Sequence, residues 1–270
     1  MADPVTICEV GPRDGLQNEA RPIPAADKIA LIRHAVAAGL TRIEATSFVS
    51  ARAVPQLADA PEVMAGAPRA AGVEYTVLVP NEKGYIRARA AGADRVAVFA
   101  SATEAFSRAN INCSIEESLD RFAPVFRAAV HDRIPVRGYV SCVTDCPFEG
   151  EVVPGAVAQV AARLLDLGAS EISLGETLGR GTPERVDAML DVVLDVVPAT
   201  RLAGHFHDTG GLALANVDVA LARGLRIFDA ALGGLGGCPF APGAPGNLAT
   251  EALVAHLLRL GHATGVDGNR

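Results

Sequence analysis

The feature that most constrains the fold of this chain is a regular alternation of short apolar runs with helix-like segments. The strand-like runs are Val5–Val10, Arg42–Phe48, Tyr75–Val79, Arg95–Ala100, Val136–Cys142, Glu171–Leu174, Leu202–Phe206 and Ile227–Leu232. Segments with apolar residues at helical spacing lie between them, for example Ala25–Ala38, Ile115–Val130, Val157–Leu167, Pro183–Val196, Ala213–Ala222 and Leu248–Leu260. Strict alternation of strand and helix predicts a parallel sheet.

The number of repeats selects an architecture. Eight strand–helix units in a chain of 270 residues are typical of an α/β TIM (β/α)8 barrel, and an open doubly wound sheet is the alternative. No linker or shift in composition divides the chain, so we expect a single domain over residues 1–270. The unusual polar residues follow the first strand and the last two strands. They meet only if the last strand closes onto the first, and the active site is then expected at the C-terminal ends of the strands.

Composition narrows the function. The chain is 50% hydrophobic and 20% charged, with a net charge of −7, which argues against nucleic acid or a membrane surface as partner. No targeting segment or span-length apolar run is apparent. An odd number of scattered cysteines suits reduced thiols, so we expect a cytoplasmic protein, or one of an organelle matrix if the source is eukaryotic. The Cys142 and Cys146 pair has no second pair for zinc, and we interpret both as buried thiols.

Two histidines form the centre of the predicted site. His205 and His207 end a strand-like run, so their side chains share one face and Phe206 takes the other. Neutral imidazoles side by side are ready metal ligands. A His-x-His pair alone is weak support, because paired histidines also occur as ordinary surface or core residues. The interpretation therefore depends on what the other loops contribute.

The other loops offer an acid, a cation, an amide and a thiol. Arg13 and Asp14 form a polar turn after the first strand, where Asp14 alone would be an ordinary turn residue. Glu44 lies inside an apolar strand and needs a partner, for which Arg13 is suitable. Asn247 is either a ligand or the N-cap of the last helix. Cys238 sits in a glycine-rich loop that permits backbone movement and has no phosphate-binding pattern.

Glu176 and Asp208 also lie near the predicted site. Glu176 ends the sixth strand and either faces the mouth of the barrel or is a solvated loop carboxylate, and Asp208 is a candidate cap for the next helix. Together the candidates offer oxygen and nitrogen ligands with an open position. Such a set suits Mg²⁺ or Mn²⁺ better than structural zinc, and it favours an enzyme.

Four long motifs connect these residues to a known family. They are Glu9–Glu19 (EVGPRDGLQNE), Ile43–Ser50 (IEATSFVS), Asn110–Ser118 (NINCSIEES) and Gly234–Glu251 (GLGGCPFAPGAPGNLATE). From about Val5 to about Val266 the chain closely resembles the 3-hydroxy-3-methylglutaryl-CoA (HMG-CoA) lyase family of metal-dependent TIM-barrel lyases. The resemblance implies retro-Claisen cleavage of an acyl-CoA thioester to acetyl-CoA and acetoacetate, as in leucine catabolism and ketone-body formation. A homodimer is plausible.

The resemblance also assigns roles by position. It implies a divalent cation, Mg²⁺ or Mn²⁺, bound by Asp14, His205, His207 and Asn247. Arg13 matches the arginine that stabilises the enolate, Glu44 the carboxylate that supports this arginine, and Cys238 the thiol that takes part in proton transfer. The base that removes the hydroxyl proton is Asp14 or a histidine such as His205, which the sequence does not rank.

Some features depart from the family pattern. Glu176 stands where the family usually has Asp, and Phe206, Gly210, Gly211 and Pro245 are further replacements expected around the mouth. These replacements bear on the acyl group more than on the reaction type. The chain also ends soon after Asp267, without the C-terminal helix and cysteine of longer members.

Three alternatives stay open. The first is a related lyase or aldolase acting on citramalyl-CoA or a longer branched 3-hydroxyglutaryl-CoA. The second is a Claisen-type synthase, which usually carries a further regulatory domain. The third is a non-catalytic barrel that binds metal or CoA.

Overall fold

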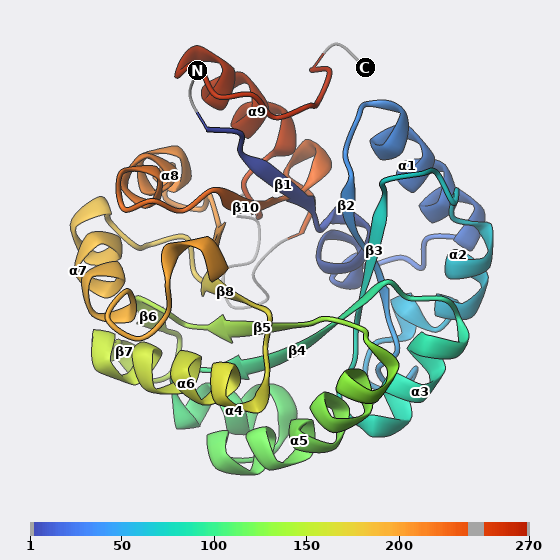
Figure 1. Ribbon diagram of the computed structural model, residues 1–270, viewed down its shortest axis with the longest axis horizontal. Helices are drawn as coiled ribbons and strands as arrows, with labels where there is room; N and C mark the ends of the chain where they lie inside the picture. Colours follow the sequence, from blue (N-terminus) through green and yellow to red (C-terminus); the bar gives the residue numbers. More distant parts are fainter. Residues whose placement is uncertain (1–2, 237–245, 269–270) are drawn as a thin grey trace.

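A computed structural model of the chain describes residues 3–236 and 246–268. Its main sheet is a closed barrel of parallel strands (Figure 1), in the order β1-β10-β9-β8-β5-β4-β3-β2. These are β1 (Thr6–Glu9), β2 (Arg42–Ser47), β3 (Glu74–Leu78), β4 (Arg95–Ser101), β5 (Val136–Ser141), β8 (Glu171–Glu176), β9 (Leu202–Phe206) and β10 (Ile227–Ala230). The pairing of β1 with β10, from Thr6↔Ile227 to Glu9↔Ala230, closes the sheet. The TIM-barrel prediction is thereby confirmed, and the open sheet is excluded.

Helices surround the barrel as an outer layer (Figure 1). They are α1 (Ala25–Ala37), α2 (Ala60–Gly66), α3 (Glu82–Ala90), α4 (Glu104–Ile111), α5 (Ile115–Asp132), α6 (Pro154–Leu167), α7 (Pro183–Val193), α8 (Ala213–Ala222) and α9 (Thr250–Arg259). Short helical turns occur at Gly11–Gly15, Pro55–Leu57, Ala199–Arg201 and Leu232–Gly234. The apolar core lies between strands and helices, and it includes Val96 and Val98 of β4 and Phe122 of α5. Gly39, Gly92, Gly168 and Gly224 each follow the end of a helix and have positive φ angles.

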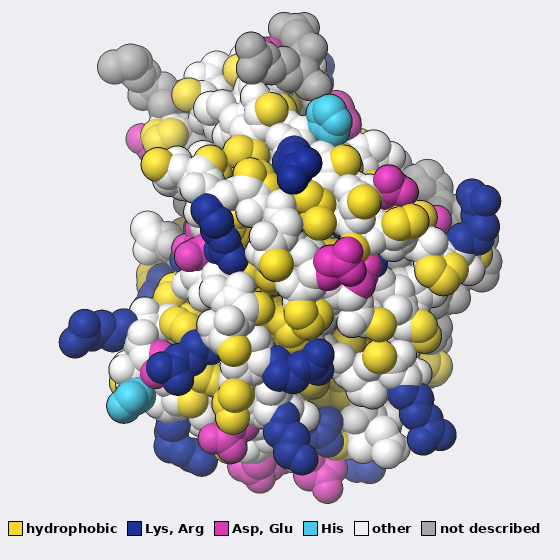
Figure 2. Space-filling model, turned by 90° about the vertical axis from the view of Figure 1, so that its right-hand side faces the viewer, with side chains coloured by type: hydrophobic (Ala, Val, Ile, Leu, Met, Phe, Trp, Pro, Cys, Tyr) yellow, Lys and Arg dark blue, Asp and Glu magenta, His cyan; other side chains and the backbone are white. Residues whose placement is uncertain are grey.

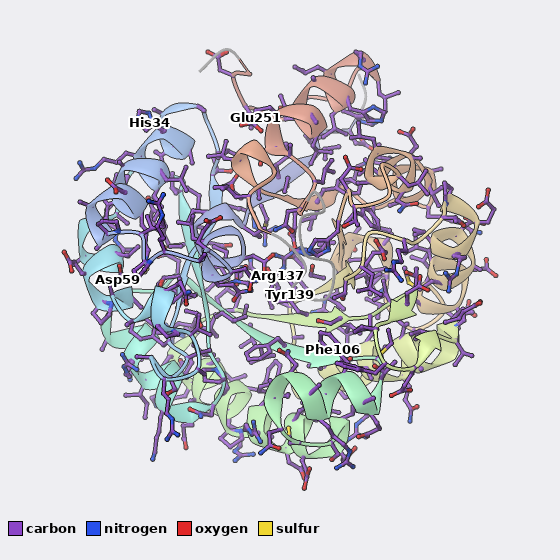
Figure 3. All side chains as sticks on the ribbon, turned by 180° about the vertical axis from the view of Figure 1, so that it is seen from behind. His34, Asp59, Phe106, Arg137, Tyr139 and Glu251 are labelled. Atoms are coloured by element: carbon purple, nitrogen blue, oxygen red, sulfur yellow. The ribbon has the colours of Figure 1, made fainter. Side chains whose placement is uncertain are left out.

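The barrel interior is polar at its N-terminal end. Arg42 binds both carboxylate oxygens of Glu171, at 2.9 and 3.0 Å, and Arg137 Nε lies 2.8 Å from Glu171 Oε1. Figure 3, which views the barrel from behind, labels Arg137 and Tyr139 near its centre. Buried charged side chains are stable only when they are paired, as these are. They fill the interior of the barrel, which is therefore packed and does not form a pore.

Several boundaries differ from the sequence prediction. The last strand ends at Ala230, because Leu232 begins a helical turn, and the last helix begins at Thr250 instead of Leu248. The polar segment after β1 contains a helical turn, Gly11–Gly15, in which the Val10 carbonyl accepts from the Asp14 and Gly15 amides. A small antiparallel hairpin, β6 (Asp145–Cys146) with β7 (Gly150–Glu151), was not predicted.

Two further expectations concern burial and surface. Cys142 and Cys146 are buried free thiols, as predicted. Figure 2 shows acidic and basic side chains interspersed with small hydrophobic areas over one side of the molecule. Across residues 3–236 and 246–268, no helix is both long enough and apolar enough to cross a bilayer.

Candidate metal centre and active site

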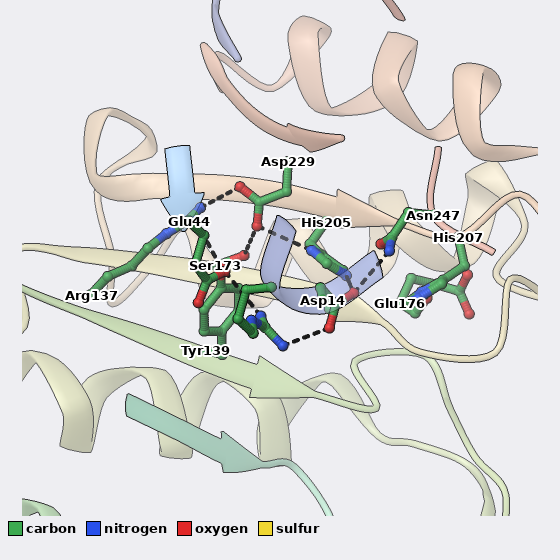
Figure 4. A network of polar contacts seen from close by, with 12 residues as sticks. Asp14, Glu44, Arg137, Tyr139, Ser173, Glu176, His205, His207, Asp229 and Asn247 are labelled. Carbon is green, nitrogen blue, oxygen red and sulfur yellow. Dashed lines mark hydrogen bonds and ion pairs between the residues drawn. The ribbon is translucent and has the colours of Figure 1, made fainter. Parts of the chain in front are cut away.

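Three predicted ligands converge at the C-terminal ends of the strands (Figure 4). Asp14 lies in the turn after β1, His205 in β9 and His207 immediately after it, and one ligand atom from each lies within 4.8 Å of the others. The two imidazole rings are 5.1 Å apart between centroids, as expected for alternate residues of one strand face. Closure of the barrel is what brings Asp14 to the histidines, since β1 and β9 both flank β10.

Asn247 joins this cluster and is not a helix cap. Its Nδ2 donates to Asp14 Oδ2 at 2.9 Å and to the Leu235 carbonyl at 3.0 Å, and its backbone bridges to His207. Ala249 occupies the N-cap position of α9. The N-cap interpretation of Asn247 is therefore wrong, and its amide lies beside the predicted metal ligands.

Hydrogen bonds orient both imidazoles. His207 Nδ1 lies 2.8 Å from the Glu176 carbonyl, which can only accept, so Nδ1 carries the proton and Nε2 keeps its lone pair. Burial, followed by the positive charge of His205, lowers the pKa of His207 to about 4, which keeps the ring neutral at pH 7. His205 Nδ1 lies 3.1 Å from Asp229 Oδ2, and its Nε2 faces Asp14 Oδ2 at 3.9 Å.

Asp229 is a buried carboxylate that the sequence prediction missed. It accepts from Arg137 at 2.6 Å and from Ser173 Oγ at 2.8 Å, in addition to its contact with His205. Burial alone would raise the pKa of Asp229, but the charge of Arg137 and the bond to His205 hold it well below its usual range. The sequence could have indicated this residue, because Asp229, like Glu44, is a charged residue within an otherwise apolar strand.

A second chain of contacts holds Arg13 against the site. Its guanidinium donates to Asp14 Oδ1 at 2.6 Å and to Glu44 Oε2 at 3.0 Å, which confirms the predicted Arg13–Glu44 pair. Tyr139 donates to the same Glu44 oxygen at 2.6 Å and accepts from Arg137 at 3.0 Å. The contacts therefore form a continuous network from Asp14 through Glu44 and Arg137 to Asp229 and His205. Arg137 and Tyr139 were missed, although their spacing puts both on the inner face of β5.

The donor set fits a divalent cation. Burial would raise the pKa of Asp14, but the charges of Arg13 and both histidines lower it to about 2, so the carboxylate is ionised at neutral pH. Together with the free Nε2 of a neutral His207, it offers oxygen and nitrogen atoms that can bind a divalent cation. Glu44 Oε1 and Arg13 Nε are buried without a partner among the described residues, which leaves polar groups for a ligand beside them.

The remaining candidate residues are not among the predicted metal ligands. Glu176 is fully buried, and its Oε1 accepts from Thr144 Oγ1 at 3.3 Å and from the Arg180 amide at 3.2 Å, so it is not a solvated loop carboxylate. Phe206 belongs to the apolar core, on the face of β9 that packs toward Phe228, so its expected position at the mouth is wrong.

Three more predictions concern the loops that follow the strands. Asp208 was expected to cap α8; its Oδ1 accepts from the Ala213 amide at the start of this helix, although Leu212 occupies the N-cap position. Gly210 and Gly211 form the turn before this helix, where the Gly210 amide donates to the Gly179 carbonyl at 2.8 Å. Cys238 and Pro245 lie outside the described residues.

A closed β/α barrel with a carboxylate, two imidazoles and an arginine at the C-terminal ends of its strands defines a TIM-barrel enzyme whose site fits a divalent cation. The sequence profile of the HMGL-like family matches residues 4–270, and the chain belongs to this family.

Relatives and solved structures agree with this assignment. The hydroxymethylglutaryl-CoA lyase of Pseudomonas mevalonii is 56% identical over 97% of this chain and 87% of its own. The 3-hydroxy-3-isohexenylglutaryl-CoA/hydroxymethylglutaryl-CoA lyase of Pseudomonas aeruginosa is 52% identical over 97% of this chain and 88% of its own. The HMG-CoA lyase structure from Brucella melitensis superposes with a TM-score of 0.98 at 60% identity, covering 99% and 95% of the two chains. An Acinetobacter baumannii HMG-CoA lyase in complex with coenzyme A and 3-methylmalate has a TM-score of 0.94 at 40% identity, covering 99% and 87%.

Proposed function

We propose that this protein cleaves 3-hydroxy-3-methylglutaryl-CoA to acetyl-CoA and acetoacetate with the help of a bound divalent cation. The convergence of Asp14, His205 and His207 beside Arg13 carries the proposal. Relatives named for this activity, over nearly the full chain, support it. The relative bound to coenzyme A supports an acyl-CoA substrate. We treat residues 1–270 as one lyase domain with its active site at the C-terminal ends of the strands; a homodimer stays a prediction.

The proposed ligands are Asp14, His205, His207 and Asn247. A cation held there would act as a Lewis acid that lowers the pKa of the C3 hydroxyl of the substrate. Removal of the hydroxyl proton lets the C2–C3 bond break: C3 becomes the ketone of acetoacetate, and the electron pair passes to C2 as the thioester enolate. Arg13 supplies positive charge where the enolate oxygen develops. Glu44 fixes the guanidinium from the opposite side, at 3.0 Å.

Asp14 is the better candidate for the base. The Nδ1 of His205 is engaged by Asp229, so Nε2 is its one free ring nitrogen. An Nε2 that binds a metal has no lone pair left for a proton, and the ligand role of His205 therefore excludes the base role. Asp14 has two oxygens: Oδ2 faces His205, and Oδ1 accepts from Arg13. Cys238, or a water beside it, would then protonate C2 to give acetyl-CoA; this role rests on the family motif.

A thioester panel tests the proposal. Purified protein is incubated with 3-hydroxy-3-methylglutaryl-CoA, with and without excess EDTA, and acetoacetate is measured. We expect acetoacetate in the untreated sample, none after chelation, and recovery on addition of Mn²⁺ or Mg²⁺. Activity that persists after complete metal removal would refute the cation, and absence of acetoacetate under all conditions would refute the substrate.

A second candidate substrate is a longer branched 3-hydroxyglutaryl-CoA. The name of the Pseudomonas aeruginosa relative combines such a thioester with the hydroxymethyl substrate. The same panel, with an isohexenyl thioester added, decides between them by comparing kcat/KM. A higher kcat/KM for the isohexenyl thioester would favour this candidate.

Asp229→Asn is expected to weaken Mn²⁺ binding by about 10- to 100-fold, the range seen when a partner of a metal-binding histidine is lost. The substitution keeps the size of the side chain but removes the charge that orients His205 and pairs with Arg137. Titration of metal-free protein with Mn²⁺, followed by electron paramagnetic resonance, measures the affinity. Ser173→Ala removes one neutral hydrogen bond to the same carboxylate and should have a much smaller effect. Equal affinities for wild type and Asp229→Asn would contradict the orienting role.

A further inference from the structure

Glu9 is a fully buried carboxylate at the end of β1, outside the proposed metal site. Within residues 3–236 and 246–268 this carboxylate forms no salt bridge, and its contacts are hydrogen bonds from two backbone amides and one hydroxyl. Burial raises the pKa of Glu9 to about 7, although hydrogen bonds to the carboxylate oppose the shift. An unpaired buried carboxylate is costly unless donors satisfy it. The position of its donors therefore indicates what the residue does.

The donors come from three separate segments of the chain. Oε1 accepts from the Gly11 amide at 2.8 Å and the Leu232 amide at 3.0 Å, and Oε2 accepts from Thr250 Oγ1 at 2.6 Å. Figure 1 shows β1, β10 and α9, to which these segments belong or which they follow, side by side in the upper part of the view. One carboxylate thus joins the turn after β1, the turn after β10 and the first residue of α9.

Each joined segment leads to a loop-borne part of the metal site. Gly11 opens the turn that carries Asp14, and Thr250 follows closely after Asn247. Leu232 opens the turn before Leu235, whose carbonyl accepts from Asn247 Nδ2. The histidines differ, because β9 itself holds His205 through its pairing with β8 and β10, and His207 follows directly after this strand. The Gly11 backbone also approaches so closely that a Cβ there would lie 2.5 Å from Glu9 Oε1.

We propose that Glu9 is a positioning residue that fixes Asp14 and Asn247 relative to each other for binding of the divalent cation. The inference rests on the proposed function, since it assumes that these two residues are ligands. Glu9 does not touch substrate or cation. It acts through the backbone, by joining two loops from opposite ends of the chain in addition to the direct bond between Asn247 and Asp14.

The hydrogen-bond geometry distinguishes three substitutions. Gln at position 9 can accept both amides on Oε1 and donate from Nε2 to the Thr250 hydroxyl, because a hydroxyl both donates and accepts. Asp is one methylene shorter and cannot reach the donors from all three segments at once. Ala leaves two buried amides without an acceptor. Positioning therefore predicts retained function for Glu9→Gln and loss for the other two.

The test measures Mn²⁺ binding to metal-free protein by electron paramagnetic resonance, without substrate, together with the unfolding temperature. We expect Glu9→Ala and Glu9→Asp to raise the Kd for Mn²⁺ about tenfold or more, the effect of removing an outer partner of a metal site. Glu9→Gln should bind nearly as wild type does. Leu164→Ala is the control, because Leu164 is fully buried in α6, far from these loops, and its loss lowers stability alone.

The outcomes separate the inference from the proposed function. Wild-type Mn²⁺ affinity in Glu9→Ala, or an equal loss in Leu164→Ala, overturns the positioning role. A wild-type protein that binds Mn²⁺ but cleaves no thioester overturns the proposed reaction. The Mn²⁺ affinities of the Glu9 variants then still decide whether Glu9 is a positioning residue. A wild-type protein that binds no Mn²⁺ overturns the ligand assignment and the positioning role together.

Discussion

Replacing His207 by alanine is expected to reduce turnover of 3-hydroxy-3-methylglutaryl-CoA by about 10³-fold or more while the barrel stays folded, because a Lewis acid supplies several kcal/mol to such a reaction. His207 lies beyond the end of β9, and among residues 3–236 and 246–268 its Nδ1 contacts the Glu176 carbonyl. Because its side chain contributes little to the core, we expect the substitution to weaken metal binding and to leave the stability of the fold nearly unchanged. Initial rates and the Kd for Mn²⁺ on the same samples measure both effects.

His262→Ala is a matched control for this substitution. His262 is also half-buried, and its Nδ1 likewise contacts one backbone carbonyl, that of Asp3 at 3.0 Å. It follows α9 and lies next to the start of the chain, away from the proposed ligands. Turnover should be unchanged in His262→Ala. Unchanged turnover in His207→Ala would refute the ligand assignment. An equal loss of turnover in both variants would indicate that the loss comes from a general effect on folding.

The barrel was predictable because its signal is repeated. Alternation of strand and helix specifies a parallel sheet, and the positions of Asp14, His205 and Asn247 in the first and last units favour closure. The ends of elements were less predictable, because tertiary contacts set them. Leu248 and Ala249 were expected within the last helix, but the Leu248 amide donates to the Phe206 carbonyl and the Leu248 carbonyl accepts from the Ala231 amide, so the helix begins later.

The site was predictable where residues lie in motifs and not where they line the lumen. Asp14, His205 and His207 stand out by type and spacing, and the structure brings them together as expected. Arg137 and Asp229 lie within strands that look apolar, and their partners are far away in sequence. Only the closed barrel turns the alternate residues of several strands toward one another. Phe206 was wrongly expected at the mouth of the barrel. The alternation of side chains along the strand directs Phe206 to the face opposite the histidines, and this part of the prediction was right.

Arg13→Lys is expected to lower kcat by about 10²- to 10³-fold, the effect of losing one donor to a developing oxyanion. The guanidinium binds Asp14 and Glu44 at the same time through its two terminal nitrogens. A lysine ammonium keeps the charge but lacks this planar fork, so it cannot hold both carboxylates and still face the enolate oxygen. Because the charge develops in the transition state, the loss should fall on kcat more than on KM.

The same substitution at Arg42 separates this effect from stability. Arg42 is also largely buried and also forks onto a carboxylate, Glu171, but it lies at the opposite end of the barrel. Arg42→Lys should lower the unfolding temperature and leave kcat unchanged, whereas Arg13→Lys should lower kcat and keep Mn²⁺ bound. A wild-type kcat in Arg13→Lys would contradict the oxyanion role. An equal fall in kcat for Arg42→Lys would indicate that the lumen charges act together, since the network that reaches Arg13 through Tyr139 begins at Arg137 beside Arg42.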